Sequence, residues 1–222
     1  MWHKKVNMDG KVAYYLTLVE KNLYNIQHYP WYPLVRETIN MCWEWVEEKK
    51  YDGYALYERL DDEETGLFAV HMNEVDAGLD DPKDELVFFC VMDAVAYTVW
   101  QAYQYEEKDY VPQAIEVIND EFIESELMGK ISKVNGYQEE WAERLKDTCL
   151  KCCGRQWQED PKRENMESNI NRTPEMDPGL NGKRLIKHGG VSVVDSAVWL
   201  LPELSHHEGF RQACRRNRSD IP

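Results

Sequence analysis

The sequence predicts an all-α protein, a helical bundle of about six helices with a C-terminal extension. Apolar residues recur at spacings of three and four through residues 1–150, which is typical of amphipathic helices. Helix start signals precede several of these stretches, and strand-like alternation is short and scarce. With 43% hydrophobic residues, 8 tryptophans and 13 tyrosines, the chain of 222 residues can bury a sizeable core.

The first two helices are predicted on either side of a proline pair. An apolar stripe over residues 12–26 predicts the first helix, and Pro30 and Pro33 end it because proline cannot donate a helical hydrogen bond. A second stripe over residues 34–50 predicts the next helix. Two lysines close it, and cations are favoured at a helix C-terminus.

Aspartates introduce the next two helices. Asp52-Gly53 starts a short helix that carries Leu56 and Leu60. Asp81-Pro82 is a stronger signal, because aspartate caps a helix and proline suits its first turn. The helix that follows, about residues 82–105, is apolar almost all round, which predicts a place in the middle of the bundle.

Two further helices complete the predicted bundle. Pro112 fits a first helical position, and apolar residues follow it on one face as far as Leu127. Asn135 stands three residues before Gln138, the spacing of a capping box, and Trp141 and Leu145 follow.

The charge divides the chain into unlike parts. Residues 1–150 hold 31 acidic and 14 basic residues, a net charge of −17, whereas residues 151–222 have a net charge of +2. Residues 159–182 have almost no apolar side chain. We therefore predict an acidic helical domain over residues 1–155, a polar linker over 156–190, and a short helical basic tail over 191–222.

The composition excludes several classes of partner. A net charge of −15 argues against binding nucleic acid and against docking on anionic lipid. The sequence contains no uninterrupted apolar stretch of about 18 residues, so we predict no membrane span. The N-terminus has no apolar signal segment, so we expect a cytoplasmic protein whose six cysteines are reduced.

The sequence gives no positive sign of catalysis. It contains no Gly-x-Ser-x-Gly motif and no glycine-rich phosphate loop, and we expect neither enzymatic activity nor a cofactor. A metal-binding helical enzyme or a regulatory domain remains the alternative. It would use a cysteine and histidine cluster without the two short-spaced ligand pairs of a zinc module: Cys149, Cys152, Cys153, His188, His206, His207 and Cys214.

An acidic and aromatic segment offers the candidate partner-binding residues. The run Asp61, Asp62, Glu63 and Glu64 lacks the ligand spacing of an EF-hand, so it is either a solvated surface or a contact for a cationic partner. Tyr54 and Tyr57 precede this run, and tyrosine beside acids makes a good interface anchor.

The same segment carries a family resemblance. Tyr51-Asp52-Gly53-Tyr54-Ala55-Leu56-Tyr57-Glu58-Arg59-Leu60-Asp61-Asp62-Glu63-Glu64-Thr65-Gly66-Leu67 resembles a motif of immunity protein family six of bacterial polymorphic toxin systems. Asp93–Tyr97, Gln101–Tyr103 and Val111–Glu116 resemble later segments of that family in the same order. The resemblance covers about residues 10–150.

The resemblance implies a small, mainly helical cytosolic antidote that binds and blocks the C-terminal domain of a cognate toxin. It implies no catalytic residues. Toxins that cut nucleic acid tend to have basic clefts, so the acid excess leads us to expect that carboxylates occlude such a cleft.

Overall fold

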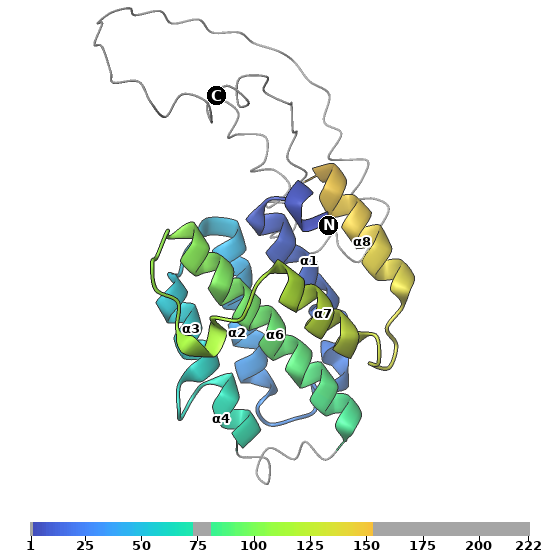
Figure 1. The fold of residues 1–222 in the computed structure, drawn as a ribbon. Coiled ribbons are helices and arrows are strands. Elements are labelled where there is room, and N and C mark those ends of the chain that lie inside the picture. Colours follow the sequence, from blue (N-terminus) through green and yellow to red (C-terminus); the bar gives the residue numbers. More distant parts are fainter. Residues whose placement is uncertain (1, 73–80, 153–222) are drawn as a thin grey trace, which may run out of the picture.

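The computed structural model describes residues 2–72 and 81–152. These residues form seven α-helices and three short 3-10 helices, with no strand among them, which confirms the predicted all-α bundle (Figure 1). The predicted linker and basic tail, residues 156–190 and 191–222, lie outside the described residues.

The longest helix, α6 (Pro82–Tyr105), lies in the middle of the bundle. It packs against α1 (Met8–Glu20), α2 (Tyr32–Glu48), α3 (Gly53–Asp61) and α7 (Asp120–Ile131). Helix α6 is therefore covered by other helices on several sides, and this explains why it is apolar on nearly every face.

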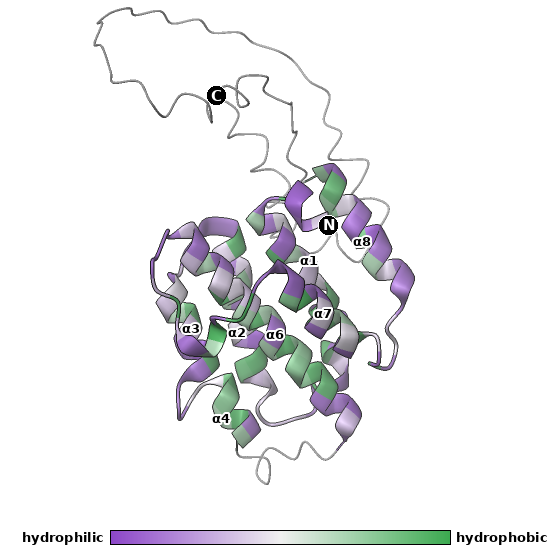
Figure 2. Ribbon diagram, in the orientation of Figure 1, coloured by the Kyte–Doolittle hydropathy of each residue, from purple (hydrophilic) through white to green (hydrophobic). Residues whose placement is uncertain are grey.

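Helix α6 is long and apolar enough to cross a membrane by length and composition alone, but 78% of its apolar stretch is buried inside the protein. A mostly buried core helix can have the same length and composition as a membrane span, and α6 is mostly buried. Figure 2 shows hydrophobic residues along the middle of α6, whereas the peripheral α8 (Glu139–Cys152) is mostly hydrophilic.

The two predicted aspartate caps are present. The carboxylate of Asp81 accepts a hydrogen bond from the backbone N–H of Lys83 at 2.9 Å, at the start of α6. The carboxylate of Asp52 accepts one from the N–H of Ala55 at 2.7 Å, at the start of α3. Each cap satisfies a helical donor that would otherwise lack a partner.

The helix start predicted at Pro112 is wrong. Pro112 has a ψ of 141°, which is extended, and it only precedes the 3-10 helix η3 (Gln113–Ile115). Helix α7 starts at Asp120 because the side chain of Asn119 accepts hydrogen bonds from the N–H groups of Glu121 and Phe122, at 2.9 and 2.8 Å.

Other boundaries also differ from the pattern. The first stripe is divided between α1 and the 3-10 helix η2 (Leu23–Asn25), and Pro33 stands in the first turn of α2. The cap predicted at Asn135 is wrong, since Gly136 has a φ of 85° and α8 starts only at Glu139. The 3-10 helix η1 (Trp2–Lys5) and the short α4 (Leu67–Met72) were not predicted.

The core is rich in aromatic side chains. The largest fully buried residues include Tyr14, Tyr15 and Tyr97, which come from α1 and α6. The rings of Tyr15 and Tyr97 meet edge to face with centroids 5.2 Å apart. A buried tyrosine needs a partner for its hydroxyl, so this core contains hydrogen bonds as well as apolar contacts.

Candidate functional site

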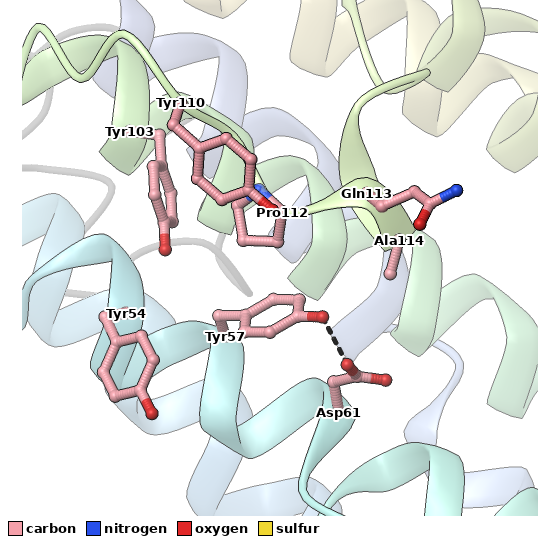
Figure 3. Close-up of a pocket in the computed structure, with 8 residues that line it drawn as sticks. All are labelled: Tyr54, Tyr57, Asp61, Tyr103, Tyr110, Pro112, Gln113 and Ala114. Atoms are coloured by element: carbon pink, nitrogen blue, oxygen red, sulfur yellow. Dashed lines mark hydrogen bonds between the residues drawn. The ribbon is translucent and has the colours of Figure 1, made fainter.

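A hollow of about 680 Å³ opens between α3 and the segment that links α6 to η3 (Figure 3). We call it the tyrosine pocket. Its lining consists of Tyr54, Tyr57, Asp61, Tyr103, Tyr110, Pro112, Gln113 and Ala114. All of these residues except Tyr110 come from three of the segments that carry the family resemblance, so segments far apart in the sequence meet at one place on the surface.

A close approach of two helices holds one wall of the tyrosine pocket. A Cβ atom on Gly53 would lie 2.5 Å from a ring carbon of Tyr103, so glycine allows α3 to pack directly on that ring. The backbone N–H of Gly53 donates to the Glu106 carboxylate at 2.6 Å. The end of α6 is thereby attached to the start of α3.

Inside the tyrosine pocket, the hydroxyl of Tyr57 donates a hydrogen bond to the carboxylate of Asp61 one helical turn away (Figure 3). Burial and this hydrogen bond raise the pKa of Tyr57 to about 12. The phenol therefore stays protonated at neutral pH and continues to donate to Asp61.

The acidic run forms the turn between α3 and α4. Asp62 accepts hydrogen bonds from the backbone N–H groups of Glu64 and Thr65 and from the Thr65 hydroxyl, at 3.1, 2.7 and 2.7 Å. The Thr65 bonds, with that from Glu64, hold the pKa of Asp62 below its ordinary value. Asp62 thus stabilises the turn, whereas Glu63 and Glu64 are exposed.

A second hollow, of about 520 Å³, lies on the other side of α3 and is lined by Glu37, Met41, Tyr51, Ala55, Glu58, Arg59, Asp62 and Thr65. Arg59 forms an ion pair there with Glu37 of α2. We call this second hollow the polar groove, and helix α3 forms a ridge between it and the tyrosine pocket.

The predicted partner-binding residues are divided by this ridge. Tyr54, Tyr57 and Asp61 line the tyrosine pocket, and Asp62 lines the polar groove. The other residues that line the tyrosine pocket were not among the predicted binding residues: Tyr103, Tyr110, Pro112, Gln113 and Ala114. All of them except Tyr110 belong to the segments Gln101–Tyr103 and Val111–Glu116, and this was their one signal, because sequence alone does not separate buried from exposed tyrosines.

The face around the tyrosine pocket is strongly acidic. Residues 52–64 and 106–116 together hold ten carboxylates and two cations, Arg59 and Lys108. Arg59 pairs with Glu37, and the Lys108 ammonium lies 3.8 Å from the Glu106 carboxylate. A surface of this kind attracts a cationic partner from a distance.

A third hollow, of about 310 Å³, lies where the N-terminus meets α7, and Trp2, His3, Asp120, Glu121, Glu124 and Ser125 line it. Behind it is a cluster that we call the polar network: His3, Lys11, Tyr15, Tyr97, Asp120, Glu124 and Lys146. Tyr15 donates to Glu124 at 2.7 Å, and Tyr97 donates to Asp120 at 2.6 Å.

Cations within the chain compensate the acids of the polar network. The Lys11 ammonium lies 2.6 Å from Asp120, and the Lys146 ammonium lies 3.5 Å from Glu124. Burial alone would raise the pKa of both carboxyl groups, but their hydrogen bonds and these cations outweigh it, so both pKa values fall below the ordinary range. Burial lowers the pKa of His3, outweighing Asp120 and Glu124, which raise it.

The metal-binding alternative finds no support in residues 2–72 and 81–152, where no group of three or more histidine, cysteine or acidic side chains is arranged to hold a metal ion. Cys149 is buried there, and Cys152 is half-buried. The other members of the predicted cluster, Cys153, His188, His206, His207 and Cys214, lie outside the described residues.

Comparison with known proteins gives a family and no individual relative. The family model described as immunity protein Imm6 matches residues 10–134, which span α1 to α7 and include every residue that lines the tyrosine pocket. A search of curated proteins and a search of solved structures found no match. The match covers more than half of the chain, which therefore belongs to the Imm6 immunity protein family.

Proposed function

We propose that this chain binds and neutralises a cognate bacterial toxin domain through the acidic face formed by α3 and residues 106–114. Its family membership carries the proposal, because immunity proteins act against toxins. The contact surface follows from the tyrosine pocket, where exposed tyrosine rings, which commonly anchor protein interfaces, lie beside the carboxylate of Asp61.

The inhibitory mechanism that fits this surface is occlusion. Residues 52–64 and 106–116, with ten carboxylates against two cations, complement a basic cleft, such as that of a toxin that cuts nucleic acid. The inhibitor needs no catalytic group and no cofactor for this purpose. We propose the cytoplasm as its place of action, and residues 1–155 as the functional domain.

The first test is protection and binding. Cells that express this chain should survive the toxin domain encoded beside its gene, and the purified proteins should associate more slowly and more weakly as salt rises. Cells that die as readily as unprotected ones would refute the function. Association that is indifferent to salt would refute the electrostatic mechanism.

Charge reversal locates the contact face. Changing Asp61, Glu63 and Glu64 to Lys should slow association about tenfold or more, because steering depends on the charge near the contact. Asp62 is left unchanged because it holds the turn. The matched control changes three exposed acids of α8, Glu140, Glu143 and Asp147, to Lys and should leave the rate within about twofold. Equal effects of the two triple variants would place the contact elsewhere.

A further inference from the structure

Four phenol rings form half of the residues that line the tyrosine pocket. Tyr54 and Tyr110 are exposed at 60% and 72%, whereas Tyr103 is only 7% exposed and Tyr57 is half-buried. Figure 3 shows the four rings around one space, with those of Tyr103 and Tyr110 next to each other. The face of an aromatic ring carries partial negative charge, so a cation over several such faces is attracted by each of them.

One wall of the tyrosine pocket is a carboxylate. Asp61 accepts the hydrogen bond from Tyr57, and a carboxylate has room for about four hydrogen bonds, so Asp61 keeps capacity for a donor from outside. None of the eight described residues that line the pocket is basic. The pocket thus joins aromatic faces and a negative charge without a compensating cation in its lining.

The same bundle holds one of its own cations in this manner. The Lys49 ammonium lies 4.0 Å from the ring centroid of Trp45 and 5.4 Å from that of Tyr105, and it forms an ion pair of 2.5 Å with Asp9. The same ammonium donates to the backbone carbonyls of Trp45 and Val46, at 3.2 and 3.4 Å. Aromatic faces and a carboxylate thus contribute to holding a cationic side chain in this protein. The tyrosine pocket offers these two kinds of group to a partner.

We propose that the tyrosine pocket receives an arginine side chain of the toxin, which stacks between the tyrosine rings and pairs with Asp61. The inference rests on the proposed function and names the anchor of that contact. A hollow of about 680 Å³ is wide enough for a long side chain. Arginine fits better than lysine because its planar guanidinium stacks on aromatic rings, is more weakly hydrated, and offers a fork of donors to a carboxylate.

Paired substitutions at the two exposed rings test this contact. Tyr54→Ala and Tyr110→Ala should each weaken binding of the toxin domain about tenfold, because each removes an aromatic face. Tyr54→Phe and Tyr110→Phe should bind within about threefold of the unchanged chain, since phenylalanine keeps the face. Tyr24→Ala is the matched control: Tyr24 is 53% exposed, and its hydroxyl donates to Asn135 far along the chain.

The cationic partner is identified by a double-mutant cycle. Each exposed arginine of the toxin domain is changed to alanine and combined with Tyr110→Ala. One arginine should couple to Tyr110, so that the second change costs much less than the first. Coupling to no residue, or to a lysine alone, overturns the inference. If the unchanged chain binds the toxin and both alanine variants bind equally well, the inference fails while the proposed function stands.

A second readout needs no toxin. N-acetyl-arginine amide, added to the full chain at millimolar concentration, should shift the ring NMR signals of Tyr54 and Tyr110. N-acetyl-norleucine amide, of similar length but uncharged, should shift them much less, and Asp61→Asn should reduce the response to the arginine probe. Equal shifts with the two probes, or none with either, overturn the inference.

Discussion

The tyrosine pocket and the polar network use the same chemistry to different ends. In both, a tyrosine hydroxyl donates to a carboxylate. In the polar network, lysines of α1 and α8 neutralise the acids, so the group links the N-terminus, α7 and α8. In the tyrosine pocket no lining residue supplies a cation. The difference teaches that acids paired with a cation of the chain stabilise the fold, whereas an acid whose pocket supplies no cation is available for recognition.

The strongest test of this comparison is one substitution made in both regions. Asp120→Ala should lower the free energy of unfolding by about 3 kcal/mol, because it leaves the Lys11 ammonium and the Tyr97 hydroxyl without their acceptor in a half-buried site. Asp61→Ala should cost less than about 1 kcal/mol, because Asp61 is exposed. Urea unfolding of both variants measures these values, and equal costs would abolish the distinction.

A smaller effect is expected where the tyrosine pocket depends on the fold. Gly53→Ala should destabilise the protein by about 1–2 kcal/mol and displace Tyr103, because the new Cβ would lie 2.5 Å from the ring. Gly129→Ala in α7 is the control, since nothing lies within 4 Å of its Cβ position. It should stabilise by up to about 1 kcal/mol. A stabilising Gly53→Ala would mean that α3 and α6 pack less closely.

The smallest expected effect is the dependence of stability on pH, and it arises in the polar network. The folded state lowers the pKa of His3 from 6.5, so below that pH the unfolded chain binds more protons and stability falls as pH falls. Urea unfolding should therefore show a less stable protein at about pH 5.5 than at pH 7. His3→Gln should reduce that slope, because it removes the group that titrates.

The loss should continue at lower pH. The pKa values of Glu124 and Asp120 are lowered from 4.5 and 3.8, so their stabilisation is complete above those values and is lost as pH falls through the lower folded-state values. The charged groups around His3 are Lys11, Asp120, Glu124 and Lys146. If the stability of the His3→Gln variant depends on pH as that of the unchanged chain does, burial of His3 is not the cause of that dependence.

Local signals predicted most of the helices. Asp52 and Asp81 are caps because the unpaired N–H groups of a first turn need an acceptor nearby in the sequence. The apolar circumference of residues 82–105 likewise predicted the central position of α6. The predicted start at Pro112 is wrong because proline also suits an extended residue, and the cap of this helix is Asn119.

The candidate site was only partly predictable. Tyr54, Tyr57 and Asp61 were named from a local acidic and aromatic run, and they line the tyrosine pocket. Tyr103 and Tyr110 could not be assigned to it, because their exposures of 7% and 72% depend on how the end of α6 packs on α3. The separate role of Asp62 in the turn likewise depends on backbone geometry around Gly66.

The sequence by itself determined the helical class, the excess of acid and the family, because periodicity, composition and motif order are properties of the chain. Only the tertiary structure decided which acids meet a cation within the protein and which tyrosines share a pocket. Those outcomes depend on contacts between residues such as Lys11 and Asp120, more than a hundred positions apart. Such contacts are fixed by packing, and packing combines all the helices at once.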